Sequence, residues 1–155
     1  MWDGLFGAAN LWAMVAWVVL VFLPRGPLAY SFVFYGGAGL LCLAYAVLLG
    51  LLLTGAVDPG ATGEGAAAGF QSIEGVRGIF MSDGGVTVGW IHYLAFDLFV
   101  GLWIARDADQ KQFSRLLQGP VLFLTFMAGP AGLLVWMLIR EGRARKGAPR
   151  RKLSL

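Results

Sequence analysis

Two long runs of apolar residues without a single charge dominate the first third of the chain, at residues 5–23 and 28–54. The hydrocarbon core of a bilayer is about 30 Å thick, and about 20 residues of α-helix are needed to cross it. Two further apolar stretches, residues 86–105 and 119–139, reach the same length, and only His92 and Asp97 within them are able to carry a charge near neutral pH. The sequence therefore predicts four membrane-spanning segments.

The composition supports this prediction. Hydrophobic residues make up 58% of the chain and charged residues 14%, whereas soluble domains carry about 25% charged residues. Because backbone groups in lipid must be satisfied within the protein, four spans of this length form helices. We expect an all-α, integral membrane four-helix bundle over residues 1–140. One cysteine and one histidine exclude a disulfide framework and a Cys/His metal cluster, so neither a metal nor a cofactor is predicted.

The residues after the fourth stretch are strongly basic. This tail, residues 141–155, carries six Lys and Arg residues directly after Arg140. Four spans place both termini on one side, and that side then holds eight Lys and Arg residues against four on the other. The positive-inside rule assigns it to the cytoplasm. We expect a bacterial inner-membrane protein with cytoplasmic termini, a tail that contacts anionic lipid, and no nucleic-acid partner.

The segment between the second and third spans has two parts. Residues 55–69 are rich in Gly and Ala and are predicted to form a connector. Residues 70–81 carry apolar side chains at helical spacing, which predicts a short helix at the membrane interface. Such a helix either caps the mouth of a cavity or simply connects the two spans.

The third span contains the residues that are best suited to acid–base chemistry. Asp97 falls near the bilayer centre, where a charged side chain costs ~3 kcal/mol, so an intramembrane carboxylate is a site hypothesis by default. Trp90, Tyr93 and Asp97 share one helical stripe, and the Tyr93 hydroxyl is within reach of the Asp97 carboxyl group. His92 is five positions from Asp97 and lies about 140° around the helix. A joint role for these two residues requires a bulge or a cavity that wraps around the helix.

Three residues of this span are the candidate catalytic groups: Asp97, His92 and Tyr93. The candidate substrate-binding residues are polar or aromatic side chains within the four spans: Trp90, Asn10, Phe96, Tyr45 and Thr125. For each of these residues, ordinary helix packing is the alternative. Gly129-Pro130 is predicted to kink the fourth span, because proline removes a backbone donor.

Several short motifs resemble those of one family. They are Leu5-Phe6 with Ala9-Asn10, Tyr45-Ala46, Gly75 with Phe80 and Ser82, Trp90-Ile91-His92, Leu94-Ala95, Asp97-Leu98-Phe99, Asp107, and Gly129-Pro130 with Gly132. In these motifs the chain resembles the plant ABA4 family and its bacterial ABA4-like relatives, which are small four-helix membrane proteins. Glu74 and Arg77 lie outside the pattern.

The resemblance implies a chemistry. The plant family is associated with the formation of neoxanthin from violaxanthin, a redox-neutral isomerisation of an epoxycarotenoid that needs neither a metal nor a nucleotide. An acid assists the opening of the epoxide while a base removes a proton from carbon. By this resemblance Asp97 donates to the epoxide oxygen, His92 is the base, and the ligand is a carotenoid or another long apolar molecule.

Two other functions remain open from the sequence. The first is a non-catalytic pigment-binding or accessory subunit of a larger membrane complex, which suits a chain with little mass outside its spans. The second is a small transporter or proton path that uses Asp97, although no inverted repeat is visible. A homodimer with the site between protomers is also an expectation, through the small residues Gly39, Cys42, Ala46 and Gly50.

Overall fold

The computed structural model describes residues 1–60 and 69–147, with side chains through Glu141. Part of the predicted connector (61–68) and the side chains of the basic tail beyond Glu141 lie outside the described residues. Every regular element in the described part is a helix. The chain divides into two compact units, residues 1–99 and 100–155. Helix α5, Asp83–Gln110, contributes to both units.

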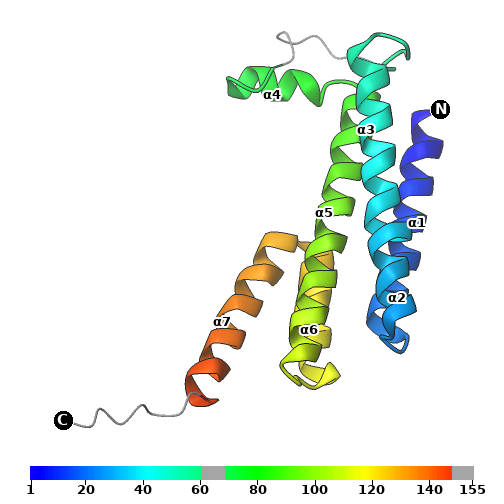
Figure 1. Ribbon diagram of the computed structural model, residues 1–155. Helices are drawn as coiled ribbons and strands as arrows, with labels where there is room; N and C mark the ends of the chain where they lie inside the picture. Colours follow the sequence, from blue (N-terminus) through cyan, green and yellow to red (C-terminus); the bar gives the residue numbers. More distant parts are fainter. Residues whose placement is uncertain (61–68, 148–155) are drawn as a thin grey trace. The chain divides into compact units, whose positions relative to one another are not determined.

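Within the described residues, three helices are long and apolar enough to cross a membrane: Trp2–Phe22, Pro27–Leu53 and Asp83–Gln110. They correspond to the first three predicted spans. Helix α1 is Trp2–Phe22, and Asp3 in its first turn complements the helix dipole. The second crossing helix begins with Pro27 in its first turn, where proline lacks only an N–H that would be unpaired anyway. Figure 1 shows α1 and this second helix side by side.

The second crossing helix is not uniform. It consists of α2 (Pro27–Ser31), the π-helical segment η1 (Phe32–Gly39) and α3 (Leu40–Leu53), without a break between them. A π-helical turn leaves carbonyl groups displaced from the usual ladder. Here the indole N–H of Trp12 on α1 donates to the carbonyl of Gly36 at 2.7 Å. A hydrogen bond from α1 therefore supports the wide turn of its neighbour.

A short helix lies between the second and third crossing helices, as predicted. Helix α4 covers Ile73–Ile79, and the Ser72 hydroxyl caps it by accepting from the N–H of Gly75 at 3.0 Å. The Ser82 hydroxyl accepts from the N–H of Gly85 at 3.0 Å at the start of α5. Figure 1 shows α4 crosswise to α3 and to the beginning of α5. The direction of α4 fits a helix that lies along the membrane surface.

The predicted fourth span differs from the structure. Residues 119–139 do not form one helix but are divided between α6, Arg115–Met127, and α7, Gly129–Gly147. Ala128 between them has φ −156° and ψ 82°, and its carbonyl accepts from the N–H of Gly132 at 3.1 Å. Because Ala128 leaves the helical φ/ψ region and Pro130 lacks an N–H, the hydrogen-bond ladder of α6 ends here. The predicted kink is therefore a complete break between two helices.

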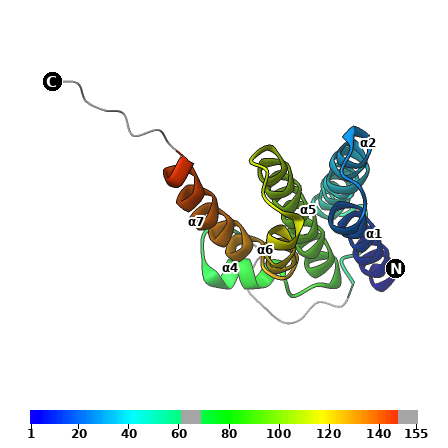
Figure 2. The ribbon, with the colours of Figure 1, turned by 90° about the horizontal axis from the view of Figure 1, so that it is seen from below.

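Helices α6 and α7 pack against each other closely at this break. A Cβ atom added at Gly132 would overlap the Thr125 hydroxyl and lie 2.5 Å from the Thr125 backbone nitrogen. Only a glycine permits this approach. Figures 1 and 2 show that the two helices form a hairpin. Helix α6 has 13 residues, which gives a length of about 20 Å, too short to cross the apolar layer by itself.

Candidate functional site

Helix α5 is a regular α-helix from Asp83 to Gln110, so no bulge brings His92 and Asp97 to one face. Asp97 is only 6% exposed, whereas His92 belongs to the exposed side of the helix. The two residues therefore have different neighbours. The candidate site separates into two faces of α5, which we describe in turn within the first unit.

The Asp97 face continues into an aromatic stack. Tyr93 forms a side-chain hydrogen bond with Asp97, as the sequence predicts. The Tyr93 ring stacks on Trp90 with a centroid distance of 5.1 Å, and Trp90 stacks on Phe6 of α1 at 5.8 Å. The indole N–H of Trp90 donates to the Asn10 side-chain oxygen at 3.0 Å. The predicted ligand-binding residues Asn10 and Trp90 thus bind each other and join α1 to α5.

The His92 face lines a pocket of about 590 Å³, which we call the α4 pocket. Helix α3 contributes Tyr45, Leu49, Leu52 and Leu53, helix α5 contributes Gly85, Val88, Gly89 and His92, and the α4 region contributes Gly69, Phe70, Val76, Gly78, Ile79, Phe80 and Ser82, with Pro59 beside them. The Phe80 ring reaches this wall because it lies directly over the Cα of Gly89. A cavity of this size and apolar character is typical of sites for small organic ligands.

The described lining of the α4 pocket carries three polar side chains: Tyr45, Ser82 and His92. The Ser82 hydroxyl is engaged in the cap of α5. The His92 ring lies 5.3 Å from the Tyr45 ring and 4.6 Å from the Phe96 ring, measured between centroids. An imidazole and a phenol thus flank an otherwise apolar space. Together they are able to accept and to donate a proton.

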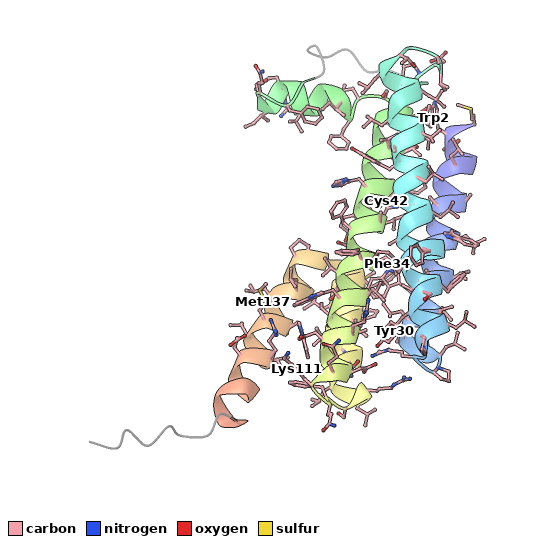
Figure 3. The ribbon with its side chains drawn as sticks, viewed as in Figure 1. Trp2, Tyr30, Phe34, Cys42, Lys111 and Met137 are labelled. Carbon is pink, nitrogen blue, oxygen red and sulfur yellow. The ribbon has the colours of Figure 1, made fainter. Side chains whose placement is uncertain are left out.

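A second cavity, the aromatic pocket, lies in the same unit and has a volume of about 300 Å³. Its lining consists of Phe34, Tyr35, Ala38, Gly39, Cys42, Ala95, Phe96 and Phe99. Phe96, a predicted substrate-binding residue, lines this pocket and also contacts His92. In Figure 3, Phe34 and Cys42 follow each other along the second crossing helix. Among the described residues no group of His, Cys, Asp or Glu is arranged to hold a metal ion.

Thr125 lines neither of these pockets. Its side chain is fully buried, and its hydroxyl donates to the carbonyl of Val121 at 2.8 Å, within α6. Gly132 of α7 covers it. In this structure Thr125 therefore serves the contact between α6 and α7, which is the packing alternative for this residue.

The sequence reasoning did not single out a polar cluster in the second unit. The Asp107 carboxylate binds Lys111 at 2.8 Å, Arg140 Nε at 3.1 Å and the indole N–H of Trp136 at 3.0 Å. Trp136 is 1% exposed and contacts the Phe113 ring edge-on at 4.9 Å. The spacing of Asp107 and Lys111, one turn apart, was the available signal. The cluster fastens α7 to the end of α5.

Comparison with known families gives a match to the ABA4-like family, described as ABA DEFICIENT 4-like, over residues 4–136. The chain belongs to the ABA4-like family. The resemblance seen in the sequence is thereby confirmed. No curated protein and no solved structure matches the chain. The ABA4-like region extends from α1 to Trp136 and contains both pockets, the Asp97 face and the Asp107 carboxylate.

Proposed function

We propose that this ABA4-like protein is a membrane-embedded isomerase that acts on a carotenoid or a related isoprenoid by acid–base chemistry. The observation that supports this function best is the α4 pocket. Leucines of α3, the α4 segment and one face of α5 line an apolar pocket of about 590 Å³. An imidazole and a phenol are the ionisable groups of its described lining, which suits an uncharged ligand that bears one oxygen function.

The two groups suffice for an isomerisation that leaves the molecular formula unchanged. His92 removes a proton from a carbon of the ligand, and Tyr45 donates its proton to the oxygen of the opening epoxide. A transfer from His92 to Tyr45, whose ring centroids are 5.3 Å apart, then restores both side chains. The apolar lining, together with the lipid around the spans, keeps the concentration of water near the opened ring low.

Asp97 and Tyr93 are candidates for the same chemistry on the other face of α5. The described lining of the α4 pocket contains neither residue. The proposal therefore assigns the base and the acid to His92 and Tyr45, and it assigns Asp97 and Tyr93 to the contact between α1 and α5.

The second candidate function is a pigment-binding protein without turnover. It is favoured by the separation of the two faces, because Asp97 and His92 do not act on one ligand when they line different sides of a regular helix. Under this function the α4 pocket binds the same class of ligand, and Tyr45 and His92 orient it by hydrogen bonds.

Expression in a carotenoid-producing host distinguishes these functions. The wild type, His92→Gln, Tyr45→Phe and Asp97→Asn are purified in mild detergent, and their pigments are separated by chromatography. We expect a new carotenoid isomer with the wild type and Asp97→Asn, and none with the other two variants. Loss of the isomer in Asp97→Asn alone would place the chemistry on the other face. Unaltered pigment bound by all four would establish the binding function, and absence of pigment from all would refute both.

We also propose a membrane topology of three crossings followed by a re-entrant hairpin made of α6 and α7. Three crossings place the end of α5 on the side opposite the N-terminus. Arg140 of α7 binds Asp107 near the end of α5, so α7 returns to that side without crossing. The apolar part of the hairpin then enters the membrane and leaves it on the same face.

The distribution of basic residues supports this topology independently. With a re-entrant hairpin, Arg77 is alone on the side of the N-terminus, and the other eleven of the 12 Lys and Arg residues lie on the opposite side. The four-span arrangement gives a division of only eight to four. By the positive-inside rule the C-terminus then lies in the cytoplasm and the N-terminus outside. This proposal differs from the expectation, based on four spans, that both termini are cytoplasmic.

A further inference from the structure

The α4 pocket and the aromatic pocket lie along the same helical faces. On α5, Val88 and His92 line the α4 pocket, while Ala95 and Phe99 line the aromatic pocket. These positions are separated by four, three and four residues, which is the spacing of one helical face. The α4 pocket and the aromatic pocket are therefore consecutive along one side of α5.

The second crossing helix repeats this arrangement. Ala38 and Cys42 line the aromatic pocket, and Tyr45 and Leu49 line the α4 pocket. Their separations are again four, three and four residues. Figure 3 shows Cys42 on this helix, between Phe34 and the end of the helix that lies near α4. The two linings thus follow one another along both helices, and on α5 they extend together from Gly85 to Phe99, a length of about 21 Å.

The rings of His92 and Phe96 lie where the two linings meet on α5. The centroids of His92 and Phe96 are 4.6 Å apart, with His92 on the side of the α4 pocket and Phe96 on the side of the aromatic pocket. The Phe96 ring is 55% exposed and lies on the open side of α5. A side chain of this exposure is able to turn, since exposed rotamers exchange within nanoseconds.

The lining of the aromatic pocket differs from that of the α4 pocket. Four of its eight residues are aromatic, and its polar side-chain atoms are confined to the Tyr35 hydroxyl and the Cys42 thiol. Phe34 packs against Phe99 at 6.4 Å and edge-on against Tyr35 at 4.8 Å. Flat rings on both walls favour a flat conjugated chain over a flexible saturated one, because stacked π systems attract each other beyond the area they bury.

We propose that the aromatic pocket holds the conjugated chain of the ligand whose ring end occupies the α4 pocket, so that this second site selects ligands by length. The inference rests on the proposed function, because it requires a ring end bound beside His92 and Tyr45. Its occupant is one ligand that passes the ring pair of His92 and Phe96. A saturated acyl chain of a neighbouring lipid is the competing occupant.

Two probes with the same ring and different chains test this inference. β-Carotene carries the full chain and retinol about half of it, and each is titrated into the protein in lipid nanodiscs while tryptophan fluorescence is followed. Cys42→Phe fills the aromatic pocket from an exposed position, and Cys42→Leu fills it partly. Leu43→Phe is the matched control, since Leu43 is 60% exposed and belongs to the lining of neither pocket.

The expected result is a length-dependent loss. Cys42→Phe weakens β-carotene binding about tenfold, ~1.4 kcal/mol, and leaves retinol binding unchanged, with Cys42→Leu between the wild type and Cys42→Phe. Leu43→Phe binds both probes like the wild type, and thermal unfolding confirms that the variants are folded. If each probe binds Cys42→Phe as tightly as it binds the wild type, the inference is overturned and the proposed function stands. This is the result expected if a lipid chain occupies the aromatic pocket. A wild type that binds neither probe would refute the proposed function and the inference with it.

Discussion

Replacing Gly132 by alanine tests the break between α6 and α7 most directly. The added methyl group would lie 2.5 Å from the backbone nitrogen and 2.6 Å from the Cα of Thr125, about 1 Å inside a normal contact. Because these are backbone atoms, no rotamer change relieves the overlap, and the two helices must separate. Overpacking of this kind typically costs about 1–3 kcal/mol, and because the obstacle is rigid backbone we do not expect a cost at the lower end of that range.

Gly7→Ala in α1 provides the control. A Cβ atom at Gly7 meets nothing within 4 Å, and alanine in a helix interior gains up to about 1 kcal/mol over glycine. We therefore expect Gly7→Ala to be neutral or stabilised and Gly132→Ala to be ~2 kcal/mol less stable than that control. For a chain of this length the difference corresponds to a melting temperature lower by roughly 4–8 °C, measured by thermal unfolding in mild detergent.

The alternative structure predicts the opposite outcome. In a continuous fourth helix, Thr125 and Gly132 are seven residues and about 10 Å apart along the axis, so an alanine at position 132 touches nothing on residue 125. Equal stability of Gly132→Ala and Gly7→Ala would therefore contradict the close contact between Gly132 and Thr125, and it would remove the structural basis of the re-entrant hairpin.

Three further predictions follow from the remaining contacts. Asp107→Asn weakens the ion pairs with Lys111 and Arg140 and should lower stability by about 1–3 kcal/mol, measured by thermal unfolding; an unchanged melting temperature would show that the cluster does not fasten α7. Fluorescent and periplasmic reporters fused to the two termini should give opposite signals, with the C-terminal fusion cytoplasmic, whereas the same signal from both would restore the four-span arrangement. A double-mutant cycle of Asn10→Ala and Trp90→Phe should give a coupling of about 0.6–1.7 kcal/mol for the hydrogen bond between α1 and α5, and a coupling of zero would mean that Asn10 is free to bind a ligand.

Much of the local structure could be predicted. The three helices long enough to cross a membrane agree with the first three apolar stretches, because burial in lipid depends on the composition of each segment and hardly on its neighbours. The contact between Tyr93 and Asp97 was also predictable, since side chains one turn apart on a helix meet wherever the helix is regular. The family was identifiable from motifs within single helices, without knowledge of their packing.

The contacts between helices could not be predicted in the same way. The sequence predicts Asn10 and Trp90 separately as ligand-binding residues. In the structure they form a hydrogen bond with each other, although they are 80 positions apart in the chain. The residues of α4 that line the α4 pocket could not be identified from the sequence, because they have no reactive side chains and contribute only the shape of an apolar wall. A pocket is formed by surfaces from several helices, and periodicity within one helix contains no information about the surface opposite it.

Composition and spacing alone establish that the chain is helical, that it enters a membrane, and that His92 and Asp97 face different directions on their helix, because each of these properties depends only on residues near one another in the sequence. Tertiary structure decides which polar groups share a cavity and how closely the two helices of the fourth apolar stretch pack. Their close packing depends on the approach of Gly132, which has no side chain, to the backbone of Thr125. A glycine in an apolar segment is compatible with a kink, a break or close packing, and only the surface it meets selects among them.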